Sequence, residues 1–143
     1  MKRSLVVTAV GMLVLLCSAQ YLRAQRPWYR GNVVEIIKQL ESDTDRFKSS
    51  LDKALDRSRL NGTQREDEIN RYVKEFEEAT DRLRNRAEER EHAPNAAREV
   101  MNRGRSINRF MNTHRLEGAE GDWAKVRNDL NRLADAYYIR WRW

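Results

Sequence analysis

The sequence predicts an all-α protein, an antiparallel up-and-down four-helix bundle that follows an N-terminal signal segment. Charged residues make up 35% of the 143 residues, whereas the chain contains only six glycines and two prolines. Beyond residue 31, four stretches place apolar residues three and four positions apart, and short polar segments separate these stretches. Dense charge, few helix breakers and this periodicity together favour long solvated helices that share one apolar core.

Residues 1–24 have the order of an export signal. Lys2 and Arg3 precede an uncharged, mainly apolar run of 13 residues, and small residues follow. The run is shorter than the roughly 20 residues that a membrane-spanning helix needs. Cleavage after Ala19 or after Ala24 fits the small-residue rule. We therefore expect an exported protein, periplasmic or secreted, and the alternative is a protein that an uncleaved segment anchors to the membrane.

Export would change both the charge and the cysteine content of the chain. Loss of residues 1–24 leaves 25 basic residues against 22 acidic ones, so the net charge falls from +6 to +3. The only cysteine is Cys17, so the mature chain would have neither a disulfide nor a thiol nucleophile. Covalent haem attachment is excluded because the chain lacks a Cys-x-x-Cys-His motif.

A lead-in over residues 25–31 precedes a single helical domain, residues 32–143. The first helix is expected over about residues 32–60. Asn32 can cap it, and Glu35 three residues later completes a capping-box pattern. Its apolar face has residues four and seven positions apart, namely Ile36, Leu40, Phe47, Leu51 and Leu55.

The second helix is expected over about residues 64–91. Thr63 can cap it, with Glu66 three residues later. Gly62 just before it can take the left-handed conformation that ends the first helix. The face of the second helix that is expected to point inward contains Ile69, Val73, Phe76, Thr80 and Leu83.

The third and fourth helices are expected over about residues 95–115 and 122–140. Asn95 and Asp122 can cap them, and a loop of residues 116–121 separates them. Their apolar faces are formed by Val100, Ile107, Phe110 and Met111, and by Trp123, Val126, Leu130, Leu133 and Tyr137. Four helices joined by short loops predict the up-and-down arrangement.

In residues 45–47, 55–63, 76–83 and 122–143 the chain resembles a family of predicted exported helical bacterial proteins that have no assigned activity. The sequences that carry the resemblance are DRF, LDRSRLNGT, FEEATDRL and a C-terminal stretch that starts with DWA and ends in two tryptophans. The resemblance implies an exported helical protein and adds no mechanism.

The two histidines offer little for catalysis or metal binding. His92 and His114 are both expected at C-terminal ends of helices, where a histidine interacts favourably with the helix dipole. Glu89 and His92 form one Glu-x-x-His motif, whereas a di-iron bundle needs two such motifs and two further glutamates. We therefore expect no enzyme, no catalytic or metal-binding residue and no cofactor.

The third helix has a basic face. A rotation of about 100° per residue places Arg98, Arg105 and Arg109 within about 40° of one another. Residues 96–115 contain five arginines and a single glutamate. Such a face suits an anionic surface or an acidic partner, and the alternative is an ordinary solvated helix face. Nucleic acid is not an expected partner, because no aromatic residue on this face could stack against bases.

The last seven residues are aromatic and basic. If the fourth helix continues, Trp141 lies on its core face and Trp143 points away. If the segment is extended, Ile139, Trp141 and Trp143 share one face. The segment then either packs against the bundle or exposes Arg140, Trp141, Arg142 and Trp143 as a patch that binds a partner.

Together these patterns predict an exported, non-catalytic helical bundle that contacts a protein or an anionic envelope surface. The residues expected to make that contact are Arg98, Arg105, Arg109, Arg140, Trp141, Arg142 and Trp143. The alternative is a periplasmic chaperone-like or stress protein, which would expose a large apolar groove, and a metal-binding bundle comes third. Membrane contact is expected only if residues 1–24 stay attached, and the oligomeric state is left open.

Overall fold

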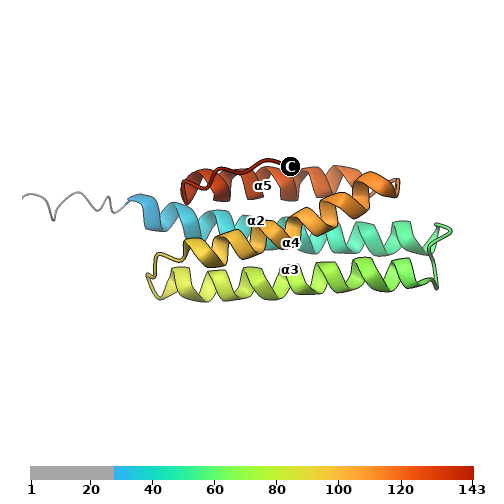
Figure 1. Ribbon diagram of the computed structural model, residues 1–143, viewed down its shortest axis with the longest axis horizontal. Helices are drawn as coiled ribbons and strands as arrows, with labels where there is room; N and C mark the ends of the chain where they lie inside the picture. The colour runs from blue at the N-terminus through green and yellow to red at the C-terminus, as the bar shows by residue number, and fades with distance from the viewer. Residues whose placement is uncertain (1–27) are drawn as a thin grey trace, which may run out of the picture.

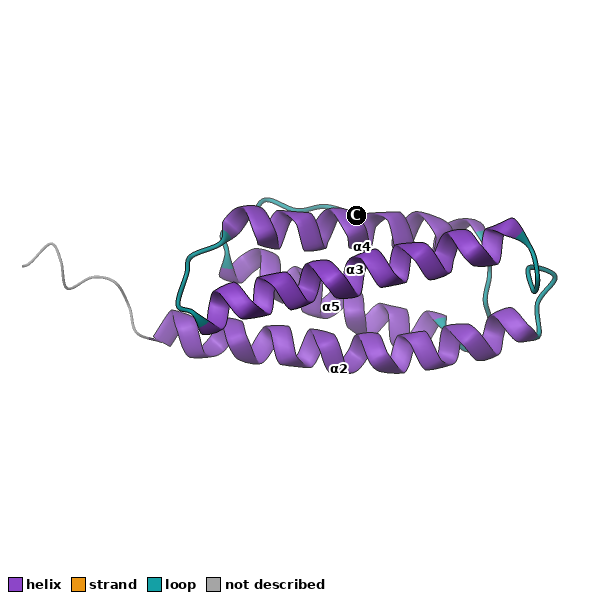
Figure 2. Cartoon of the chain, turned by 90° about the horizontal axis from the view of Figure 1, so that it is seen from below, coloured by secondary structure: helices purple, strands orange, loops and turns teal. Residues whose placement is uncertain are grey.

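The computed structural model describes the backbone of residues 28–143 and the side chains from residue 32 onward. These residues form four helices, α2 (Trp28–Asp56), α3 (Gln64–Glu88), α4 (Pro94–Thr113) and α5 (Glu120–Ala136), and the part of the chain described contains no strand (Figures 1 and 2). The predicted all-helical fold with four packed helices is therefore confirmed. The predicted signal segment and its two cleavage sites lie outside the described residues.

The helices surround one core in cyclic order. α2 packs against α3 and α5, and α4 packs against the same two helices, so α2 lies diagonally opposite α4. Consecutive helices run in opposite directions along the bundle (Figure 1). The seam between α2 and α3 is consequently on the opposite side of the molecule from the seam between α4 and α5. Within residues 28–143, no helix combines the length and the apolar character needed to cross a bilayer.

The apolar faces expected from the spacing form the core. Phe47 of α2 and Trp123 of α5 pack with their ring centroids 5.0 Å apart. The indole nitrogen of Trp123 donates a hydrogen bond to the buried amide oxygen of Asn108 at 3.0 Å, which satisfies the one polar group of this buried aromatic side chain. Other fully buried large residues come from all four helices and one loop, namely Ile37, Leu40, Leu51, Leu55, Ile69, Phe76, Leu83, Met101, Ile107, Leu116 and Leu130.

Gly104 lets α4 approach α5 closely. A Cβ atom built at this position would lie 2.7 Å from Cδ1 of Leu130 and 3.5 Å from Cε2 of Phe76. The first distance is too short for any side chain, so the fully buried Leu130 would have to shift, whereas the second is an ordinary van der Waals contact. Glycine at this position thus leaves room for Leu130.

Several helix starts differ from the predicted ones. α2 already begins at Trp28, within the expected lead-in, so Asn32 lies inside the helix. α4 begins at Pro94, whose fixed φ suits a first helical residue, and not after Asn95. α5 begins at Glu120, which places Asp122 in the first turn, where its charge faces the helix dipole favourably. Thr63 caps α3 as expected, accepting a hydrogen bond from the backbone N–H of Arg65.

The helices also end earlier than their apolar patterns suggested. α2 ends at Asp56 instead of near Leu60, and the Ser58 hydroxyl donates to the Leu55 carbonyl that a longer helix would have used. α3 ends at Glu88, and Arg90 takes a left-handed conformation with φ of 65°. The backbone N–H groups of Arg90 and Glu91 then bond back to Ala87 and Arg86, closing a Schellman motif.

Candidate functional site

The chain reverses direction at the end of α5. Tyr137 is buried and stacks on His92 with centroids 5.6 Å apart, and Tyr138 has a left-handed φ of 55°. The N–H of Ile139 donates to the carbonyl of Ala134 at 2.8 Å, which closes a second Schellman motif. The predicted fourth helix, which we expected to reach residue 140, therefore ends at Ala136 because the chain turns back over the bundle.

Residues 137–143, here called the tail, run back along α5 (Figure 1). Ile139 and Trp141 are partly buried and pack against the core, while Arg140 and Arg142 between and after them are exposed. This alternation is the extended arrangement of the two that the sequence left open. The tail therefore covers apolar surface with one side and presents charge with the other.

Trp143 fixes the end of the tail. Its indole nitrogen donates to the Asn131 side chain of α5 at 3.0 Å, and its ring meets those of Trp123 and Trp141 edge-on at 6.3 and 5.4 Å. Trp143 is still 39% exposed, and Tyr138 at the start of the tail is 79% exposed. Aromatic surface is thus available beside the arginines.

The three predicted arginines of α4 are all exposed, and one of them joins the helix to the tail. The Arg105 guanidinium lies 4.3 Å from the centroid of the Trp141 ring and donates to the Arg142 carbonyl at 3.1 Å. Arg98 donates to the uncharged Asn95 side chain at 3.0 Å. Within the described residues Arg109 has no hydrogen bond or ion pair from its side chain.

The structure therefore brings the two predicted groups of residues together on one side. We call them the arginine–aromatic surface, which consists of Arg98, Arg105, Arg109, Arg140, Trp141, Arg142 and Trp143. Its charge is not neutralised from within α4, because the acidic residue of this helix, Glu99, pairs with Arg82 of α3 at 2.8 Å. The remaining arginine of α4, Arg103, also turns toward α3 and pairs with Glu75 at 2.6 Å.

The histidines are held by local contacts. His114 has its Nδ1 3.1 Å from the Phe110 carbonyl oxygen and stacks on the Phe110 ring at 4.3 Å. His92 is exposed and stacks on Tyr137, and Glu89 is exposed as well. Among residues 28–143, no group of three His, Cys, Asp or Glu side chains is arranged to hold a metal ion.

A buried carboxyl pair escaped the sequence analysis. Asp43 of α2 is 6% exposed and Asp129 of α5 is 2% exposed, and they face each other across the largest helix interface of the bundle. Asp43 accepts hydrogen bonds from Gln39 and Arg46, both at 3.1 Å. Asp129 accepts one from Arg132 at 3.0 Å, and its Oδ2 has no hydrogen-bond partner within the described residues.

Burial raises the pKa of Asp129, and the neighbouring Asp43 carboxylate raises it further, whereas Arg132 opposes the shift. The pair is suited to hold one proton between two helices. The signal in the sequence was weak: Asp43 lies four residues before the core residue Phe47, at a position where an apolar side chain would be expected. Nothing in the sequence indicated which residue would face it, since Asp129 is 86 positions away.

Comparisons with protein-family models, with curated proteins and with solved structures give no match for this chain. The resemblance to exported helical proteins therefore stays a prediction from the sequence.

Proposed function

We propose that this chain is an exported, non-catalytic binding module that contacts a protein or an anionic envelope surface through the arginine–aromatic surface. The observation that carries the proposal is the Arg105 side chain, which stacks on Trp141 and bonds to the tail backbone. It links a basic helix face to a basic and aromatic tail, so that seven residues from two distant segments form one continuous surface.

The chemistry of this surface suits an anionic partner. Arginine guanidinium groups bind carboxylates and phosphates through paired hydrogen bonds, and they are enriched with tryptophan and tyrosine where proteins bind partners. The Arg109, Arg140 and Arg142 side chains make no ion pair within the described residues, so each can bind an incoming anion without first breaking one.

The non-catalytic part of the proposal is supported by the placement of the reactive side chains. His92 stacks on Tyr137, and His114 stacks on Phe110 and has its Nδ1 3.1 Å from the Phe110 carbonyl oxygen. For the chaperone-like alternative we expected a large exposed apolar groove. Among the described residues, the exposed large hydrophobic side chains are Tyr138 and Trp143, so no observation favours that alternative.

Export is the part of the proposal that rests on residues 1–24 alone. Expression of the full chain in a Gram-negative host, with cell fractionation and intact-mass measurement, tests it directly. A periplasmic product that begins at Gln20 or Gln25 supports an exported binding module. An uncleaved product in the membrane fraction would instead indicate a tethered bundle.

Binding is tested by co-sedimentation of the purified chain with an isolated envelope fraction at low and at high salt. We expect sedimentation at low salt, because the attraction between exposed charges is screened as ionic strength rises. The variant Arg140→Glu/Arg142→Glu should lose most of this sedimentation with the envelope fraction. The matched control is Arg59→Glu/Arg115→Glu, which changes the net charge equally at two exposed loop positions outside the surface.

Equal loss of binding in both variants would show that net charge, and not this surface, attracts the protein to the envelope. Full binding by Arg140→Glu/Arg142→Glu would contradict the proposed role of the tail. Either result would overturn the assignment of the surface, whatever the export experiment shows.

A further inference from the structure

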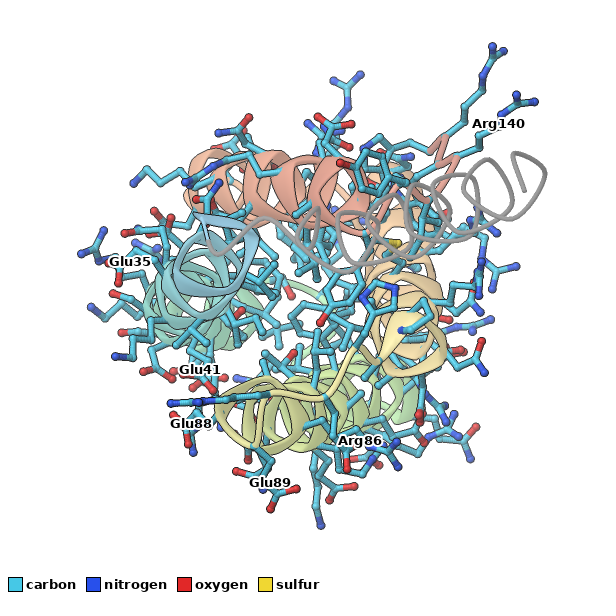
Figure 3. The ribbon with its side chains drawn as sticks, turned by 90° about the vertical axis from the view of Figure 1, so that its left-hand side faces the viewer. Glu35, Glu41, Arg86, Glu88, Glu89 and Arg140 are labelled. Atoms are coloured by element: carbon cyan, nitrogen blue, oxygen red, sulfur yellow. The ribbon has the colours of Figure 1, made fainter. Side chains whose placement is uncertain are left out.

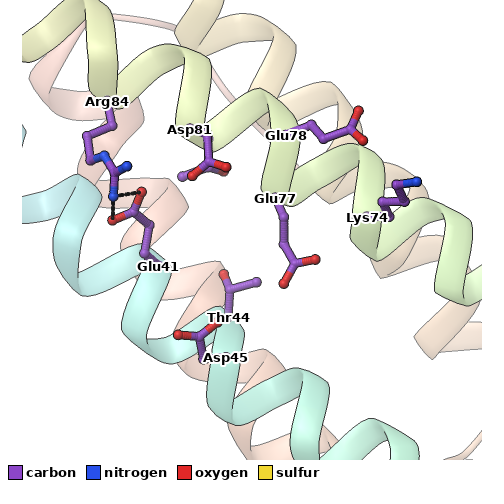
Figure 4. A pocket seen from close by; sticks show the side chains of 9 residues that line it. Glu41, Thr44, Asp45, Lys74, Glu77, Glu78, Asp81 and Arg84 are labelled. Atoms are coloured by element: carbon purple, nitrogen blue, oxygen red, sulfur yellow. Dashed lines mark hydrogen bonds and ion pairs between the residues drawn. The ribbon is translucent and has the colours of Figure 1, made fainter.

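The side of the bundle opposite the arginine–aromatic surface carries the opposite charge. An acidic groove follows the seam between α2 and α3 and contains Glu41, Asp45, Glu77, Glu78 and Asp81 (Figure 4). Its basic residues are Lys74 and Arg84. Five carboxyl groups against two basic groups give this seam a clear excess of negative charge.

Part of that charge is already neutralised within the molecule. Glu41 pairs with Arg84 at 3.2 Å across the groove, and Glu77 pairs with Lys48 at 3.0 Å (Figure 4 shows the first pair). The remaining three carboxylates, those of Asp45, Glu78 and Asp81, are exposed and make no ion pair or side-chain hydrogen bond within the described residues. These three groups are therefore available to an external cation.

Basic groups that lack a carboxylate partner among the described side chains lie on the far side, where Arg98 bonds to the Asn95 side chain and Arg105 bonds to the tail. Arg109, Arg140 and Arg142 are exposed and, within the described residues, no carboxylate pairs with them. Figure 3 looks along the bundle and shows Arg140 pointing outward near α5, while Glu41 lies between α2 and α3 at the opposite corner. The bundle thus has a negative side at the seam between α2 and α3 and a positive side at the opposite seam, between α4 and α5.

We propose that these two sides bind each other in successive copies of this chain, so that the acidic groove of one molecule receives the arginine–aromatic surface of the next. The two surfaces are different, so the contact is heterologous and leaves one free surface of each kind at every step. A second copy offers the guanidinium groups of its arginine–aromatic surface to the three carboxylates of Asp45, Glu78 and Asp81. The association is therefore open-ended unless the rotation between copies closes a ring.

The contact should be weak and strongly dependent on salt. Its ion pairs lie at the molecular surface, where each contributes little and is screened within about 10 Å at 0.1 M ionic strength. An anionic partner on the arginine–aromatic surface would compete with the next copy, because both need the same guanidinium groups. The inference does not rest on the proposed function, since it needs no partner other than the chain itself.

Sedimentation velocity of the purified chain at low and high salt tests the proposal. We expect a weight-average mass at least about twice that of the monomer at low ionic strength, and the monomer when the Debye length falls to about 3 Å near 1 M salt. Arg140→Glu/Arg142→Glu lowers the summed side-chain charge of the arginine–aromatic surface from +5 to +1, and Glu78→Lys/Asp81→Lys changes that of the groove from −3 to +1. Each variant alone should be monomeric, and an equal mixture of the two should associate again.

The control Arg59→Glu/Arg115→Glu should associate like the wild type, because neither residue lies on either surface. A monomeric wild type at low salt, association by either double variant alone, or no association in the mixture would each overturn the proposal. The two proposals are separable, because Glu78→Lys/Asp81→Lys keeps the arginine–aromatic surface. That variant should still sediment with the envelope fraction while it no longer associates with itself.

Discussion

Replacing Asp129 by asparagine should stabilise the protein at neutral pH. The side chain is almost completely buried, its Oδ2 has no hydrogen-bond donor within the described residues, and it faces the Asp43 carboxylate. An asparagine amide has a similar shape and can donate a hydrogen bond to Asp43, which removes the repulsion between two buried negative charges. In the variant, the hydrogen bond between residue 129 and Asp43 therefore exists at every pH, whereas the wild type forms it only at low pH, when the pair holds a proton.

The size of the effect follows from two opposing contributions. A hydrogen bond to a charged group stabilises a protein by about 1.5–3 kcal/mol. The variant loses the ion pair with Arg132, whose side chain is 46% exposed, and a pair of that kind contributes about 0–1 kcal/mol. We expect a net gain of about 1 kcal/mol in the free energy of unfolding at pH 8.

The pH dependence has a definite sign. The folded state raises the pKa of Asp129 above its ordinary value of 3.8, so the folded chain holds this proton more tightly than the unfolded chain. Stability from this group therefore falls as pH rises from the unfolded-state pKa to the folded-state pKa, and the loss is complete above the latter. Asp129→Asn should lack this fall, so its advantage over the wild type should be largest at pH 8 and smallest in acid.

Urea unfolding followed by circular dichroism, at several pH values between about 4 and 8, measures both the free energy of unfolding and its pH dependence. Comparing the two proteins at each pH cancels the contributions of carboxyl groups that do not interact with residue 129. Asp52→Asn, at an exposed position of α2, removes the same charge and should leave the pH dependence unchanged. A destabilised Asp129→Asn protein, or one with the pH dependence of the wild type, would refute the argument.

Two further substitutions test the backbone of the fold. Arg90→Gly should raise the free energy of unfolding by about 0.5–1 kcal/mol. A left-handed conformation costs a residue with a Cβ about 1–2 kcal/mol, and part of the gain is offset because glycine loses more conformational entropy on folding. A loss of stability in urea would contradict the Schellman end of α3. Gly104→Val should lower it by about 2 kcal/mol, because the added atoms meet Leu130, whereas Gly104→Ala should cost less since alanine favours the helix by about 1 kcal/mol. Equal stability of the valine variant and the wild type would mean that α4 and α5 are farther apart at this point.

The helices and the core were predictable because they depend on local patterns. Residues three, four and seven positions apart lie on one side of any helix, so the spacing of Leu40, Phe47 and Leu51 was enough to predict their burial. The Thr63 cap was equally local, because a side chain and a backbone N–H two residues later are close in any helix start.

The helix ends were less predictable. α3 and α5 end in left-handed residues that are not glycine, Arg90 and Tyr138, so no glycine marked either end. At the end of α5 the helix competes with the packing of Ile139 and Trp141 along the bundle, and that packing exists only in the folded protein.

The arginine–aromatic surface was predicted as two separate groups, and its continuity was not. Helical periodicity placed Arg98, Arg105 and Arg109 on one face of a helix. In the tail, the alternation of an extended segment placed the arginines on one side and the tryptophans on the other. The contact between Arg105 and Trp141 joins residues 36 positions apart. A contact over that separation depends on where the chain reverses, which the apolar pattern of the fourth helix did not show.

The sequence by itself determined that residues 28–143 form four helices and which side of each helix faces inward. Only the tertiary structure decided that α2 lies beside α5 and opposite α4, that Asp43 faces Asp129, and that the acidic and basic sides are opposite each other. The reason is physical. Periodicity and capping act within about two turns of one helix, whereas the order of helices around a core depends on how all four apolar faces fill space together.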